Sequence, residues 1–202
     1  DGDIKGRATL VGSRTSSSLV PLARTDSSQG LFVEASARTG AYRHELGAYT
    51  ARPNLYFGDY PLATGTRGAY WRIDRSDSRM NWGGALDFER AAPNDSFNLF
   101  GYRRASASGN FQYLLDRNTS FGGSLNLMQM RYEGASTGAA SQAQSPGSRF
   151  RSVYADAFYQ TRFFDWPRSR FSLSVRRNEA IVLGDGTATG QELQWEQDWI
   201  GG

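Results

Sequence analysis

The chain has 202 residues and contains no cysteine, one lysine (Lys5) and one histidine (His44). Without cysteine it has neither disulfide bonds nor thiolate metal sites. No apolar run reaches the roughly 18 residues that a transmembrane helix requires. The start, Asp1-Gly2-Asp3, lacks the basic and apolar regions of a signal peptide, so we expect an exported form to be a mature chain. No phosphate loop and no dinucleotide fingerprint is present, so the sequence predicts no cofactor. No repeat of fixed period is visible, which counts against propellers and solenoids.

The charge of the chain does not indicate a polymeric ligand. The sequence has 22 arginines and one lysine against 20 acidic residues, which gives a net charge of +3. Because the basic residues are dispersed and alternate with acids, the sequence predicts no nucleic-acid surface.

Large aliphatic residues are also scarce for a soluble β protein of this size. Aromatic residues make up 13% of the chain, glycine occurs 23 times, and the mean hydropathy is -0.57. A membrane barrel needs apolar side chains only on its outward face, so its average hydropathy resembles that of a soluble protein. The low hydropathy is therefore compatible with a membrane location.

Strict alternation of apolar and polar residues is the strongest pattern in the chain. In Arg79–Glu89 one parity holds Met80, Trp82, Leu86 and Phe88, and the other holds Asn81, Asp87 and Glu89. Since successive side chains of a strand point to opposite faces, this segment predicts a strand with one apolar and one polar face. The same pattern returns around 31–38, 69–74 and 171–176.

The pattern predicts an all-β, antiparallel, up-and-down fold of about 10–12 strands in a single domain, 1–202. Residues 1–30 read as less regular, with a first strand near 4–11 and loops at 13–18 and 26–30, and 134–149 reads as a long mobile loop. Compact turns are expected at 92–95, 116–119 and 165–168. The further strands are expected at 31–38, 40–50, 54–58, 67–75, 79–91, 96–105, 109–116, 119–132, 150–162, 169–178 and 190–199.

Aromatic residues gather toward the ends of these strands, as at Tyr70-Trp71 and Trp195 to Trp199. Trp and Tyr are favoured at membrane interfaces, where the ring meets apolar surface and the polar atom meets water. Their placement predicts two aromatic girdles. The alternative is that they are ordinary aromatic residues of a β core.

In strand length, alternation, aromatic placement and hairpin rhythm, residues 31–199 resemble a bacterial outer-membrane β-barrel. Two features depart from that pattern: the last residues are Trp199-Ile200-Gly201-Gly202 rather than a terminal aromatic, and the expected strand number is not clearly even. From these departures we expect either a segment of a larger barrel or an incomplete final strand. The resemblance implies a non-enzymatic channel or export pore in the outer membrane, in contact with lipid and lipopolysaccharide, and with further barrel chains or periplasmic proteins as partners.

The polar parity supplies the candidate site. Charges of both signs in a pore brace its walls and tune which solutes pass. The predicted pore-lining residues are Glu34, Arg38, Arg43, Glu45, Arg72, Asp74, Asp87, Glu89 and Arg176.

Two other functions remain open from the sequence. A soluble all-β module would use exposed Trp and Tyr to stack on sugars. A membrane-barrel hydrolase would use His44, with Ser152, Ser172 or Asp156 brought near it from other strands.

Overall fold

The computed structural model describes residues 3–16, 25–52, 56–57, 60–61, 65–92, 101–133, 147–162, 168–182 and 186–200. Within these ranges the chain forms strands and turns, and no helix in them is long and apolar enough to cross a membrane. The strands are β1 (Asp3–Ser16), β2 (Thr25–Thr39), β3 (Tyr42–Ala51), β4 (Tyr56–Phe57), β5 (Tyr60–Pro61), β6 (Thr66–Ser76), β7 (Met80–Ala91), β8 (Gly101–Leu114), β9 (Ser120–Glu133), β10 (Arg149–Thr161), β11 (Arg168–Val182) and β12 (Gly186–Ile200).

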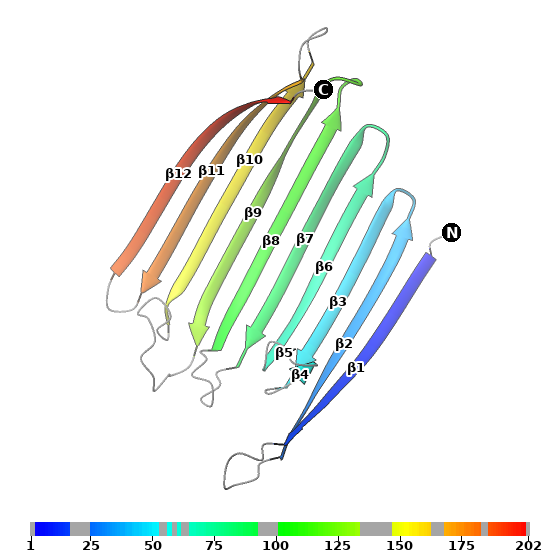
Figure 1. Cartoon of the computed structure of the whole chain (residues 1–202), viewed down its shortest axis with the longest axis vertical. Coiled ribbons are helices and arrows are strands. Elements are labelled where there is room, and N and C mark those ends of the chain that lie inside the picture. The colour runs from blue at the N-terminus through cyan, green and yellow to red at the C-terminus, as the bar shows by residue number, and fades with distance from the viewer. Residues whose placement is uncertain are drawn as a thin grey trace.

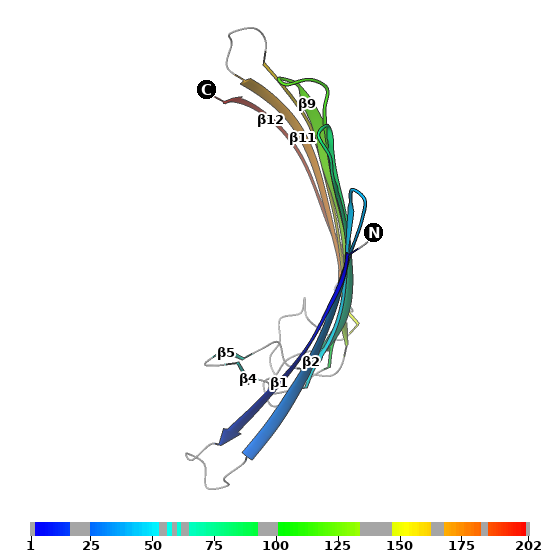
Figure 2. The ribbon, with the colours of Figure 1, turned by 90° about the vertical axis from the view of Figure 1, so that its right-hand side faces the viewer.

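Ten of these strands form one antiparallel sheet, and β4 and β5 form a small separate pair (Figure 1). The order across the large sheet follows the order along the chain, so the predicted all-β, up-and-down arrangement is confirmed. Strands β1 and β12 lie at opposite edges and do not pair with each other. The sheet is open, and Figure 2 shows it edge-on as a single curved layer with a concave and a convex face.

Two boundaries predicted from the sequence are wrong. The described parts of the expected strands 96–105 and 109–116 form the single strand β8, while residues 96–100 lie outside the described residues. Its middle, Ala105 to Asn110, is made of small residues typical of loops, yet it still alternates Ala or Gly with Ser or Asn. The predicted loops 13–18 and 26–30 are strand in their described parts, because Ser13 pairs with Ser28 and the β1–β2 ladder continues to Ser16 and Thr25.

The connections at one edge of the sheet are short. Gly40 and Ala41 join β2 to β3, and Gly40 has a φ of 60°, which glycine adopts without strain. In the β6–β7 turn, the Asp77 carboxylate accepts hydrogen bonds from the backbone N–H groups of Arg79 (3.0 Å) and Met80 (2.7 Å). These bonds lower the pKa of Asp77. The Asp116 carboxylate accepts the Asn118 N–H (2.7 Å) in the next turn, and its pKa is lowered in the same way.

The opposite edge carries longer connections, between β3 and β6, β7 and β8, and β9 and β10. The expected compact turn at 92–95 lies, apart from Ala92, outside the described residues. Most of the expected loop 134–149 and of the expected turn 165–168 lies outside the described residues; Arg149 itself begins β10. We call these two rims, which are formed by the ends of the strands, the short-turn edge and the long-connection edge. They are distinct from the edge strands β1 and β12.

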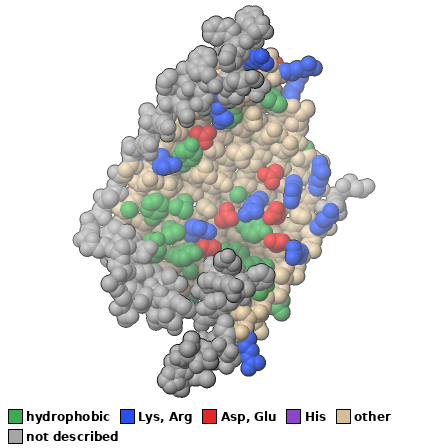
Figure 3. Space-filling view, viewed as in Figure 1, with side chains coloured by type: hydrophobic (Ala, Val, Ile, Leu, Met, Phe, Trp, Pro, Cys, Tyr) green, Lys and Arg blue, Asp and Glu red, His purple; other side chains and the backbone are tan. Residues whose placement is uncertain are grey.

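Strand register assigns every side chain to one of the two faces, because paired residues point to the same side. Acidic and basic side chains are scattered across the middle of the concave face, which Figure 3 views. By register the mid-strand acids, such as Asp87 and Glu89, share one face, and Leu86 and Phe88 occupy the other. The concave face is therefore the polar parity of the sequence, and the convex face is the apolar parity.

Little apolar surface is buried between these faces. Among the described residues only Ala51 and Ala91 are buried hydrophobic side chains. A one-layer sheet has no interior, so its stability depends on what covers its apolar side.

Candidate functional site

All nine predicted pore-lining residues lie on the concave face. The pairing of β2, β3, β6 and β7 places eight of them on one continuous surface, and the pairing of β8 to β11 places Arg176 on the same side. They do not form one cluster. Strands β8, β9 and β10 separate Arg176 from the rest, and its guanidinium lies 5.5 Å from the ring centre of Tyr154.

One group of charges bridges β2, β3 and β6. Glu45 accepts a hydrogen bond from Arg72 at 3.5 Å and lies 3.9 Å from Arg43. The Arg72 guanidinium also lies 4.7 Å from the centre of the Tyr70 ring, and the Tyr70 hydroxyl donates a hydrogen bond to Glu34 at 3.2 Å. Each pair is partly exposed and weak by itself. Together they hold both signs of charge at fixed positions on the concave surface.

A second group is centred on Glu89, near the long-connection edge. The Glu89 carboxylate accepts hydrogen bonds from the hydroxyls of Tyr49 and Tyr102, the latter at 2.6 Å, and Arg104 lies at 3.4 Å. Its side chain is only 13% exposed. Sequence reasoning placed Glu89 on this face but missed Tyr49, Tyr102 and Arg104. Strand parity contained the signal, because all three fall on the polar parity of β3 and β8.

Glycine in mid-strand makes room for these tyrosines. A Cβ atom added to Gly47 would lie 2.2 Å from the Tyr70 ring, and one added to Gly68 would lie 2.6 Å from the Tyr49 ring. Gly47 is paired with Tyr70, and Gly68 with Tyr49. The rings therefore lie across the backbone of the neighbouring strand, which explains small residues where a packed core would place bulk.

The convex face carries the large apolar side chains of the described strands. Among the described residues, every large hydrophobic side chain in a strand that is exposed projects from this face, including Phe88 (58% exposed) and Leu46 (53%). The others are Ile4, Leu10, Leu31, Val33, Trp71, Leu86, Phe111, Phe121, Leu125, Leu127, Val153, Tyr159, Leu173 and Val175. Such a continuous apolar surface far exceeds the patch that a soluble monomer tolerates.

Aromatic residues form a belt on the convex face at the short-turn edge. The cross-strand row Met80, Tyr113, Phe121, Tyr159 and Phe171 runs through β7 to β11. Trp82 packs edge-on against Tyr42 in the adjoining row, with ring centres 6.0 Å apart. The predicted second girdle is not found among the described residues. Tyrosines near the long-connection edge, such as Tyr49 and Tyr102, point instead to the concave face.

The residues proposed for a hydrolase are not brought together. His44 lies on the convex face of β3, where it stacks on Trp71 with ring centres 6.4 Å apart. Ser152, Ser172 and Asp156 lie on the concave face of β10 and β11, with the sheet between them and His44. Asp156 accepts a hydrogen bond from Ser124. The described part of the chain also holds no group of three or more His, Asp or Glu residues able to bind a metal ion.

The chain matches no protein-family model, and no curated protein or solved structure is similar to it. The two faces of the sheet are therefore the features that bear on function.

Proposed function

We propose that the chain forms the wall, or part of the wall, of a β-barrel channel in a bacterial outer membrane. In this proposal the convex face meets lipid and the concave face lines a water-filled pore through which hydrophilic solutes pass. The observation that carries it is the separation of side chains: exposed aliphatic and aromatic residues on the convex face and charges of both signs on the concave face. A membrane barrel has this polarity, apolar outside and polar inside.

The dimensions of the apolar band support the proposal. In β7 the convex face is apolar from Met80 to Phe88 and becomes charged at Arg90. The eight steps from Met80 to Phe88 span about 27 Å along an extended strand, and the ten steps to the charged Arg90 span about 34 Å. With the tilt of about 45° usual in membrane barrels, the band is about 19–24 Å high, near the roughly 25 Å apolar band that such barrels present to lipid.

The open edges also fit this proposal. Among the described residues, β1 and β12 each pair on one side only, and unpaired edges are unfavourable both in water and in hydrocarbon. In the membrane we expect them to pair with each other or with strands of further chains, which would close the pore.

Planar-bilayer conductance tests the proposal, with Asp87→Asn and Ser108→Asn as a matched pair of variants. Both positions lie on the concave face in mid-strand, and only the first change removes a charge. We expect the full chain, purified in detergent, to give stepwise conductance. Asp87→Asn should shift the reversal potential toward anion permeability, and Ser108→Asn should leave it unchanged.

Two results would contradict the proposal. One is a chain that remains monomeric and folded in water without detergent and binds oligosaccharides, as a soluble sugar-binding module would. The other is insertion into bilayers without conductance above that of protein-free bilayers.

A further inference from the structure

Five arginines form a continuous row across the convex face at the long-connection edge. Arg67 of β6 pairs with Arg90 of β7, Arg90 with Arg103 of β8, Arg103 with Arg131 of β9, and Arg131 with Arg149 of β10. All five side chains are exposed. Because neighbouring strands lie about 4.8 Å apart, each guanidinium is placed beside another of the same charge. Like charges directly opposite each other destabilise a sheet.

The protein supplies little compensation for this repulsion. Glu133 contacts Arg90 at 3.3 Å and Arg103 at 2.5 Å. Arg67, Arg131 and Arg149 form no ion pair with any described residue. Among the described residues, one carboxylate thus pairs with two of the five guanidinium groups. The row is an arrangement that favours binding of anions from outside the chain.

The surface beside the row is apolar over β6 to β8, at Ala69, Phe88 and Ala105, and polar over β9 and β10, at Gln129 and Arg151. A shallow hollow of about 600 Å³ is lined by four of the arginines and by Ala69, Phe88 and Ala105. A second hollow of about 340 Å³ continues along the apolar band past Leu86, Leu127 and Val153, with Arg151 at its margin. A ligand that fits both parts has anionic groups at one end and a long apolar part at the other.

We propose that the arginine row binds the phosphate groups of a multiply phosphorylated lipid, whose acyl chains lie in the adjoining hollows. Lipopolysaccharide carries such a headgroup in its lipid A part. The inference rests on the proposed function, since it requires the convex face to meet lipid. In that setting the row lies at the level of the headgroups, on the side of the membrane reached by the long connections. The guanidinium group of arginine presents N–H donors in a planar fork that can bind two phosphate oxygens at once.

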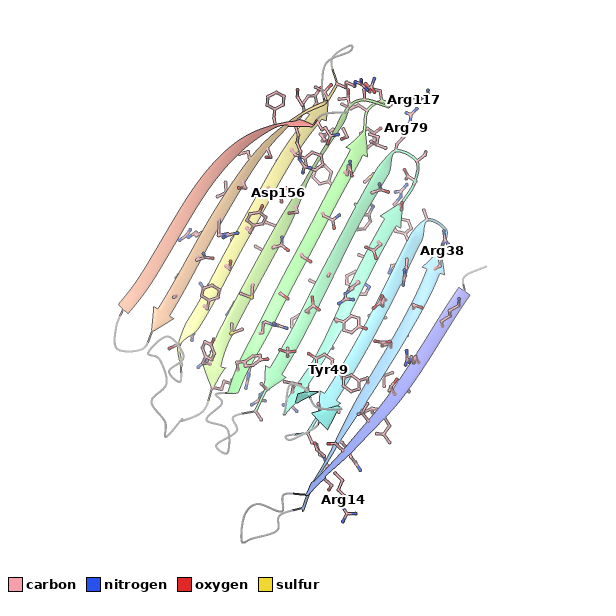
Figure 4. The ribbon with its side chains drawn as sticks, in the orientation of Figure 1. Arg14, Arg38, Tyr49, Arg79, Arg117 and Asp156 are labelled. Atoms are coloured by element: carbon pink, nitrogen blue, oxygen red, sulfur yellow. The ribbon has the colours of Figure 1, made fainter. Side chains whose placement is uncertain are left out.

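Binding of diphosphorylated lipid A to the full chain in non-ionic detergent micelles, measured by native mass spectrometry, tests the proposal. The test variant changes Arg67, Arg131 and Arg149 to Gln, because these three form no ion pair with any described residue. The control variant changes Arg38, Arg79 and Arg117 to Gln. These arginines lie toward the short-turn edge, as Figure 4 shows. The test and control variants each lose three positive charges, so they differ only in where the charges are removed.

We expect the test variant to bind lipid A about a hundredfold more weakly than the unchanged chain, or about fivefold for each arginine. The control variant should bind within about twofold. Lipid A without phosphates should bind equally to the unchanged chain and to the test variant. If the triple variant does not fold, Arg131→Gln and Arg117→Gln provide the same comparison singly.

The proposal is wrong if the test and control variants bind lipid A equally, or if dephosphorylated lipid binds as well as lipid A. It is also wrong if inorganic phosphate or a single-stranded oligonucleotide binds the row as tightly as the lipid. These failures are distinct from failure of the channel, because a chain that conducts and inserts normally can still lack this lipid site.

Discussion

Substitution of neighbouring small residues in β8 by arginine separates the two faces of the sheet most sharply. Ala107 lies on the convex face, paired with Leu86 and Leu127 in the middle of the apolar band. Ser108 is the next residue, lies on the concave face and is paired with Ala85 and Asn126. The two changes therefore add the same charge at nearly the same depth, and they differ in the face that receives it.

The expected cost follows from that position. Arginine on the lipid face near the middle of a bilayer costs roughly 2–4 kcal/mol, whereas changes facing the lumen cost little. Ala107→Arg should therefore lower the free energy of unfolding in lipid vesicles by about 2–4 kcal/mol, and Ser108→Arg should lower it by less than about 1 kcal/mol. If both faces met water, each change would be worth roughly 0.5 kcal/mol or less.

Equilibrium unfolding in guanidinium chloride, with the chain folded into phospholipid vesicles and followed by tryptophan fluorescence, gives both values. A soluble two-faced sheet would show equal, small effects. Equal effects of Ala107→Arg and Ser108→Arg would refute the assignment of the convex face to lipid. A larger effect of Ser108→Arg would reverse the two faces.

Two further predictions concern local structure. Gly123→Ala should destabilise the fold by about 1–3 kcal/mol, because the new methyl group would meet the backbone oxygen of Asp156. Gly12→Ala, which meets no atom within 4 Å, should change stability by less than about 0.5 kcal/mol, and thermal unfolding of both variants gives the comparison. Lowering the pH should loosen the β6–β7 turn, because the pKa of Asp77 is lower in the folded chain than in the unfolded chain. The stabilisation by the Asp77 carboxylate is complete above the unfolded pKa of about 4 and is lost as the pH falls through the folded pKa. The protection factor of the Met80 amide against hydrogen exchange should fall over that range in the unchanged chain and be low at every pH in Asp77→Ala.

Much of the sheet is predictable from the sequence because alternation extends over whole strands. The parity of Arg79–Glu89 correctly places Leu86 and Asp87 on opposite faces of β7, and the same reasoning assigns all nine predicted lining residues to one face. Alternation was harder to recognise in β8, where Ala105 to Asn110 consists of small residues. There, pairing with β7 and β9 on both sides decides the structure.

The contacts within the faces were not predictable, since they depend on strand register. Nothing in the local sequence of β3 indicates that Tyr49 meets Glu89, because the contact crosses β6. The arginine row has the same origin: Arg67, Arg90, Arg103, Arg131 and Arg149 are spread over five strands and align only when the hairpins fix the offsets between them. The second aromatic girdle was expected from position along the strands alone, without the parity that turns Tyr102 to the concave face.

Accessibility of nitroxide labels at Leu86 and Asp87 tests the central claim most directly. The chain has no cysteine of its own, so Leu86→Cys and Asp87→Cys each give one labelling site. In lipid vesicles we predict that the label at 86 is relaxed strongly by molecular oxygen, which concentrates in the bilayer, and weakly by a water-soluble nickel complex. The label at 87 should show the reverse. Equal exposure of both labels to the nickel complex would contradict the account.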